Sequence, residues 1–178
     1  MGEGTRGELV AHAAQVVAAP PKRSANTPST WSRADEATFL QGIDDDGYRN
    51  AMRDIIAGCI PLGLTLEWGS RGASIRLSTP DRSEPLSIGW VLPEGAHWSG
   101  ARNASFGVDP ASLAATPSVA QAVTRYVDEI GKISGASAVP TKSLRAFTLG
   151  PNALPVAHAR ILEALAQLVA DVNGSRDE

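Results

Sequence analysis

The side chains with the greatest chemical potential in this sequence lie together in one short polar segment. Glu94, His97, Trp98 and Arg102 offer a carboxylate, an imidazole, an indole and a guanidinium. Such a set suits the binding of an anion or a planar ligand, because a guanidinium attracts negative charge and an indole offers a flat stacking surface. Arg71, in a glycine-bounded turn further upstream, adds a second guanidinium. The sequence therefore predicts no catalytic residue but a ligand- or partner-binding site that comprises Trp98, His97, Arg102, Glu94 and Arg71.

A second interpretation of the same segment stays open. Glu94 and His97 are residue types that serve as general acid and base, and Arg102 is suited to hold an anion. The alternative to a binding module is therefore a small enzyme that acts on an anionic or planar ligand. A deep pocket in which Glu94 and His97 converge would favour this alternative.

The residue types that ligate metals predict neither a metal site nor a cofactor. The three histidines are His12, His97 and His158, which lie far apart, and the single Cys59 excludes a cysteine-based zinc site. The run Asp44–Asp46 lacks the alternating ligand positions and the distal Glu of a calcium loop, so we expect Asp45 or Asp46 to cap a helix. The motifs G-x-S-x-G, H-E-x-x-H and C-x-x-C are absent from the sequence.

Hydrophobic periodicity predicts the elements that must position these residues. The fold class is α+β, with an antiparallel three- to five-stranded sheet packed by helices on one face, in the order α-α-β-β-β-(β)-α-β-α. We expect a hairpin turn at Gly69–Gly72, because this segment joins two alternating strands rather than a strand and a helix. In chain order the elements are helices over 33–42 and 47–59, strands over 64–68, 73–78 and 86–92, a short strand near 106–108, a helix from Thr116–Pro117, a strand over 144–149 and a helix over 155–172.

Alternation along the strands predicts where the four tryptophans lie. The third strand places Leu86, Ile88, Trp90 and Leu92 on one apolar face. Trp68 has the same phase in the first strand, so Trp68 and Trp90 are expected in the core. Trp31 is expected to pack the first helix against the body, and Trp98 lies in a segment that we expect to be irregular. Only Trp98 is therefore predicted to serve in recognition.

The opposite phase of the first two strands carries polar side chains. If these strands pair, Glu67 and Arg76 are placed to form an ion pair across them. A structural role for this face is the favoured interpretation, and a binding groove over it is the less favoured one.

Composition shifts divide the chain into four parts. We expect a helical arm over 1–18, a proline-rich linker over 19–30, a single α+β domain over 31–174 and a disordered tail over 175–178. The arm is interpreted either as a frayed terminus or as a segment that docks on a protein partner or on a second copy of the chain.

Charge and cysteine content limit the class of partner. The formal net charge is −3 over 178 residues, and no region is strongly basic, so binding to nucleic acid by this chain alone is expected to be weak at best. No run of about 18 apolar residues exists, which predicts no association with a membrane. A single cysteine and the lack of a leader-like start favour a cytoplasmic location.

Over roughly residues 31–172 the chain resembles an uncharacterised bacterial domain that is found attached to restriction-endonuclease-like and other DNA-directed proteins. The residues that carry the resemblance are Trp31, Phe39-Leu40, the hairpin Leu66–Gly72 and the strand Leu86–Trp90. The resemblance implies association with a nuclease in DNA processing or defence. It implies no nuclease activity, because Glu67 is the one acid on the predicted strands and no acid-x-Lys pair follows it. We therefore expect a non-catalytic binding module of a bacterial cytoplasmic protein.

Overall fold

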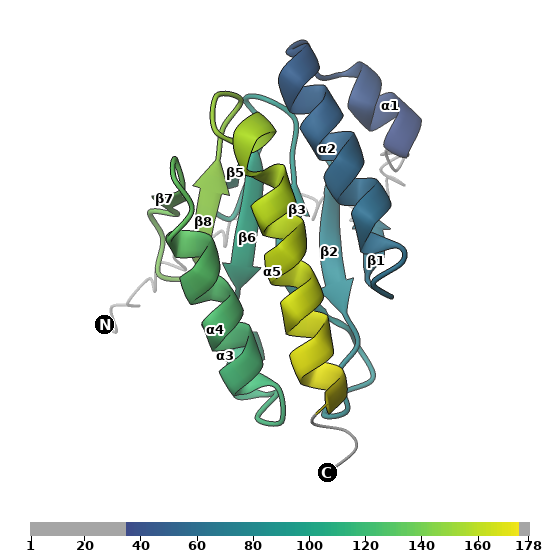
Figure 1. The fold of residues 1–178 in the computed structure, drawn as a ribbon. Helices are drawn as coiled ribbons and strands as arrows, with labels where there is room; N and C mark the ends of the chain where they lie inside the picture. Colours follow the sequence, from purple (N-terminus) through teal and green to yellow (C-terminus); the bar gives the residue numbers. More distant parts are fainter. Residues whose placement is uncertain (1–34, 175–178) are drawn as a thin grey trace, which may run out of the picture. The chain divides into compact units, whose positions relative to one another are not determined.

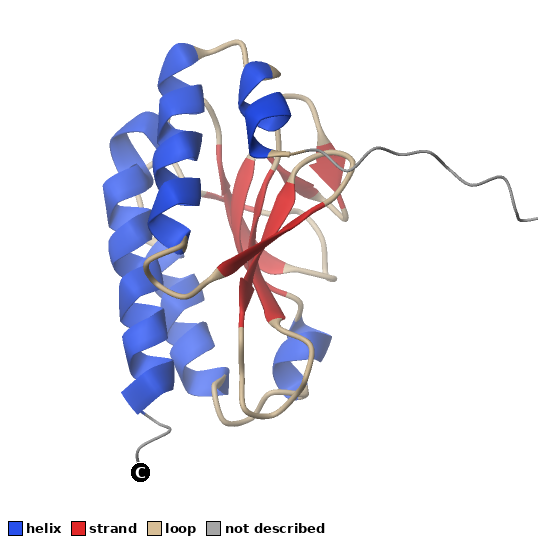
Figure 2. Cartoon of the chain, turned by 90° about the vertical axis from the view of Figure 1, so that its right-hand side faces the viewer, coloured by secondary structure: helices blue, strands red, loops and turns tan. Residues whose placement is uncertain are grey.

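The computed structural model describes residues 35–174 and contains an antiparallel sheet covered by helices on one face, as the sequence predicts (Figure 1). The helix layer consists of α2 (Asp46–Cys59), α5 (Leu154–Gly174) and α4 (Ala120–Gly131), with α5 packed against both of the others. Figure 2 shows these three helices on one side of the sheet. The predicted arm, linker, tail and Trp31 packing lie outside the described residues.

The main sheet has six strands in the order β1-β2-β3-β6-β8-β7, and a separate hairpin pairs β4 with β5. The prediction of three to five strands omits the short β7 and the hairpin, because two-residue strands leave no periodic signal. The remaining elements are α1 (Glu36–Gln41), β1 (Thr65–Trp68), β2 (Ala73–Leu77), β3 (Leu86–Val91), β4 (His97–Trp98), β5 (Ala101–Arg102), β6 (Ala104–Val108), α3 (Pro110–Ala114), β7 (Ser137–Ala138) and β8 (Arg145–Leu149).

Aspartate side chains begin the first two helices. Asp45 caps α2 by accepting a hydrogen bond from the Tyr48 amide at 2.7 Å, which confirms the capping role expected for the Asp44–Asp46 run. Asp35 caps α1 in the same way, by accepting from the Thr38 amide at 2.7 Å. The prediction that this helix begins near residue 33 is therefore wrong, since its first helical residue is Glu36.

An irregularity in β3 reverses the facing of the residues that follow it. In the pairing with β2, Ile75 lies opposite Gly89 and Arg76 lies opposite Ser87, so Ile88 has no partner residue across the ladder. This is a β-bulge, which lets two successive residues face the same side. Ile88 and Val91 belong to the core beneath the helices, whereas Trp90 belongs to a different cluster. The Ile88 carbonyl at the bulge accepts a hydrogen bond from the Tyr126 hydroxyl of α4 at 3.0 Å.

The bulge corrects the prediction that Leu86, Ile88, Trp90 and Leu92 share one face. Trp90 and Leu92 instead form a second apolar cluster on the face of the sheet that the helices do not cover. The hairpin β4–β5 and the segment 139–144 cover part of this cluster. Its buried members are Trp90, Leu92, Ala101, Val139, Leu144 and Ala146.

Cys59 lies on the buried face of α2. Burial raises the pKa of its thiol from the ordinary 9.0 to about 11, and burial also raises the pKa of Tyr48 and of Tyr126. Above pH 9 the thiol ionises in the unfolded chain but stays protonated in the folded one. The unfolded state then binds fewer protons, so stability is present in full below pH 9 and falls as the pH rises toward 11.

We therefore expect urea unfolding to show a steeper loss of stability between pH 9 and pH 10 for the native chain than for Cys59→Ala. The lost thiol volume shifts the variant's stability by an offset that does not depend on pH, so the slope isolates the ionisation of the thiol. Equal slopes for the two proteins would contradict the assignment.

Candidate functional site

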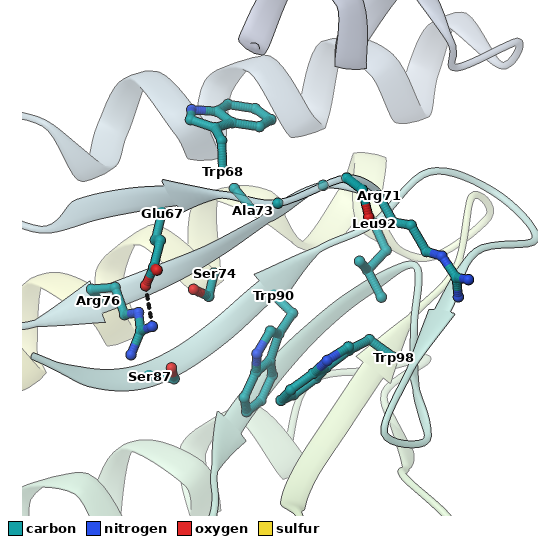
Figure 3. A pocket seen from close by; sticks show the side chains of 13 residues that line it. Glu67, Trp68, Arg71, Ala73, Ser74, Arg76, Ser87, Trp90, Leu92 and Trp98 are labelled. Carbon is teal, nitrogen blue, oxygen red and sulfur yellow. Dashed lines mark hydrogen bonds and ion pairs between the residues drawn. The ribbon is translucent and has the colours of Figure 1, made fainter. Parts of the chain in front are cut away.

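A groove of about 770 Å³ lies over β1, β2 and β3, on the face of the sheet opposite the helix layer (Figure 3). This volume falls in the range of small-molecule binding sites. The floor is polar, one wall is aromatic, and the β1–β2 turn closes one end. The lining residues are Glu67, Trp68, Gly69, Ser70, Arg71, Gly72, Ala73, Ser74, Arg76, Ser87, Trp90, Leu92 and Trp98.

Two stacked indoles form the aromatic wall. The ring centroids of Trp90 and Trp98 are 5.5 Å apart and the rings are inclined by 30°. Trp90 is 5% exposed and Trp98 is 51% exposed. The buried ring therefore supports the other, and the half-exposed Trp98 lines the groove beside it, with Trp90 nearer to Ser87 (Figure 3). Trp68 differs, because its ring points to the helix side and packs edge-on against Phe39 at 5.5 Å.

A tight hairpin holds Trp98 in this position. His97 pairs with Arg102 and Trp98 pairs with Ala101. The turn residues have positive φ, 49° at Ser99 and 91° at Gly100, as in the two-residue turns that match strand twist. The prediction of an irregular segment here is therefore wrong, because this pair of turn residues closes a hairpin. Ala101 is buried in the second cluster, so the Trp98–Ala101 side of the hairpin faces the sheet.

The β1–β2 turn brings Arg71 to the aromatic wall. The turn is the hairpin predicted for Gly69–Gly72, and the Gly69 amide donates to the Gly72 carbonyl at 2.7 Å. Arg71 donates from Nη1 to the carbonyl of His97 at 3.2 Å. This contact joins the turn to β4 directly beside Trp98.

The floor of the groove comes from the polar phase of the strands. Glu67 and Arg76 form the predicted cross-strand ion pair, and Arg76 also donates from Nη1 to the Pro85 carbonyl at 3.1 Å. Ser74 lies opposite both Glu67 and Trp90 in the ladder, and Ser87 lies opposite Arg76. The floor thus presents hydroxyls and a neutralised charge pair.

The five residues predicted for the site separate into two groups. Trp98 and Arg71 line the groove, and His97 contributes its carbonyl to Arg71. The side chains of His97 and Arg102 share the face of the hairpin opposite Trp98, and both residues are exposed. Glu94 is also exposed and is not part of the groove lining.

The groove therefore does not contain the acid–base pair that the alternative enzyme interpretation requires. No ion pair joins Glu94 to His97 or Arg102 within the part of the chain that the structure describes. In residues 35–174 no three His, Cys, Asp or Glu side chains converge in a way that suits a metal ion. The enzyme interpretation stays a prediction without support from this geometry.

Several groove residues were not predicted as site residues. Glu67, Ser74 and Arg76 carried a signal in the sequence, namely their common polar phase on two paired strands. Trp90 carried none, because its facing depends on the bulge.

Comparison with protein-family models, with curated protein sequences and with solved structures finds no match to this chain. Over residues 35–174, no helix combines the length and apolar character needed to cross a membrane.

Proposed function

We propose that this chain is a non-catalytic binding module and that the groove over β1–β3 is its recognition surface. The observation that carries the proposal is the half-exposed Trp98, held against a buried Trp90 at the edge of a polar groove. Exposing a large indole to water is unfavourable, and a ligand that covers the ring removes this apolar surface from water. The preformed stack also reduces the conformational entropy that a ligand must overcome.

A flat ring is the ligand group that this wall suits best. Aromatic rings prefer offset stacking at the centroid separation that Trp90 and Trp98 already have, so a third ring extends the stack. The hydroxyls of Ser74 and Ser87 and the Glu67–Arg76 pair line the same groove and offer hydrogen bonds to polar groups of the ligand.

The cellular setting of the module is part of the proposal. We place it in the bacterial cytoplasm, with a link to DNA-directed proteins, on the support of the sequence resemblance and the single cysteine. The acidic net charge of −3 argues that a link to DNA would act through a protein partner.

The proposal is tested by nuclear magnetic resonance with the neutral planar compounds indole, benzimidazole and adenosine. We expect these compounds to shift the indole N–H resonances of Trp98 and Trp90, and to leave that of Trp68 in place because its ring lies on the helix side. Stacking on an aromatic side chain contributes about 1–3 kcal/mol, so Trp98→Ala is expected to weaken binding about tenfold or more.

Trp98→Phe serves as the matched variant, because it keeps a flat ring at the same position. Binding that survives Trp98→Ala unchanged, or shifts confined to Trp68, would overturn the proposal.

A further inference from the structure

Arg71 is the second guanidinium that lines the groove, and it is held differently from Arg76. Its guanidinium contacts the His97 carbonyl, and no carboxylate of residues 35–174 forms an ion pair with it. Arg76 differs, since Glu67 holds it. The groove thus contains one compensated and one uncompensated guanidinium.

The position of Arg71 is set by two constraints. Gly72 follows it with φ of 148°, and a Cβ built there would lie 2.1 Å from the Val91 carbonyl oxygen, so the turn approaches β3 closely. The hydrogen bond to His97 then orients the guanidinium toward β4. An arginine held by one acceptor keeps further N–H donors in its planar fork for a second partner.

Arg71 and Trp98 lie at the same end of the groove. Arg71 is bonded to the residue that immediately precedes Trp98, and both side chains line the cavity (Figure 3). A ligand whose ring stacks on Trp98 can therefore extend a substituent toward the guanidinium. Guanidinium groups bind carboxylate and phosphate through charge-assisted, often bidentate, hydrogen bonds.

We propose, building on the ring-binding function above, that the ligand is a planar aromatic ring with an anionic substituent. The ring stacks on Trp98 and the carboxylate or phosphate binds Arg71. The one carboxylate in the groove lining, Glu67, is paired with Arg76, which lowers its repulsion of the ligand. The ligand is a small molecule, because one unpaired arginine does not make the extended cationic track that a nucleic-acid strand requires.

The experiment compares anionic rings with their neutral counterparts by calorimetric titration. Indole-3-acetate is paired with indole, and adenosine 5′-monophosphate is paired with adenosine. Hydrogen bonds to charged groups are stronger than those between neutral groups, so we expect each anion to bind roughly tenfold or more tightly than its neutral partner. The pair that shows the larger gain of the anion over its own neutral ring identifies carboxylate or phosphate as the preferred substituent.

Two arginine variants separate the specific contact from general charge. Arg71→Gln is expected to lower the affinity for each anion to that for the neutral ring. Arg82→Ala removes a cation that is paired with Glu84 at 3.2 Å outside the groove. This variant is expected to leave the preference for the anionic ring over the neutral ring unchanged. Inorganic phosphate alone is expected to bind more weakly than the nucleotide, because it lacks the ring.

The outcomes distinguish this inference from the function on which it rests. Equal affinities for neutral and anionic rings, or a preference that survives Arg71→Gln, would overturn the anion site while ring binding still supports the binding function. If inorganic phosphate binds as tightly as the nucleotide, stacking on Trp98 does not contribute to binding of this ligand. Absence of binding by every ring would overturn both proposals.

Discussion

Trp90→Ala is expected to lower the free energy of unfolding by about 3–5 kcal/mol, the range for truncating a large buried aromatic residue. Trp90 is 5% exposed and belongs to the apolar cluster that joins the sheet to the β4–β5 hairpin and to the segment 139–144. Its loss removes this packing and leaves a cavity between the sheet and the hairpin. It also removes the ring against which Trp98 stacks, so ligand binding in the groove is expected to fall in the same variant.

Trp98→Ala is the matched control for stability. Trp98 is 51% exposed, and truncation there removes less buried surface, so we expect a loss of about 1 kcal/mol or less. Urea unfolding of the two variants measures the difference. A similar loss for both would contradict the division of the stack into a buried support and an exposed contact.

Gly72→Ala is expected to lower the free energy of unfolding by about 3 kcal/mol and to weaken the binding of anionic rings at Arg71. The added Cβ would lie 2.1 Å from the Val91 carbonyl oxygen and 3.2 Å from Leu92 Cδ2, on a residue whose φ of 148° disfavours side chains. The turn must move away from β3 to relieve this contact, because the obstacle is backbone. The movement takes Arg71 away from the His97 carbonyl.

Gly63→Ala separates the two causes of strain. Gly63 also has positive φ, 73°, but an added Cβ meets nothing within 4 Å. Only the conformational cost of about 1 kcal/mol is therefore expected there, with no effect on binding. If Gly72→Ala costs no more than Gly63→Ala in urea unfolding, the close approach of the turn to β3 does not limit stability.

The local physics of the chain accounts for the parts of the fold that the sequence predicts. The α2 stripe of Ile55, Ile56 and Cys59 is buried, and the alternation in β1 and β2 yields both the hairpin and the Glu67–Arg76 pair. Each of these follows from periodicity within one element or between neighbours joined by a short turn. Contacts between residues that lie far apart in the sequence give no such periodic signal.

The orientation of Trp90 shows where prediction from strand alternation fails. The run from Ile88 to Val91 is apolar throughout apart from Gly89, so its composition suits either phase of a strand. A bulge that inserts one residue decides the phase, and the Tyr126 hydroxyl, which binds the Ile88 carbonyl at the bulge, comes from α4. Alternation assumes an uninterrupted ladder and therefore predicts the opposite face.

By itself the sequence determined the α+β class, the helix layer on one face, the β1–β2 hairpin and the prediction that Trp98 serves in recognition. Only the tertiary structure decided that Trp98 rests on Trp90, and that Arg71 reaches a carbonyl 26 residues further along the chain. It also turned the side chains of His97 and Arg102 to the other side of the hairpin. The physical reason is that a site is formed by contacts between segments, whereas periodicity reports only which face each segment buries.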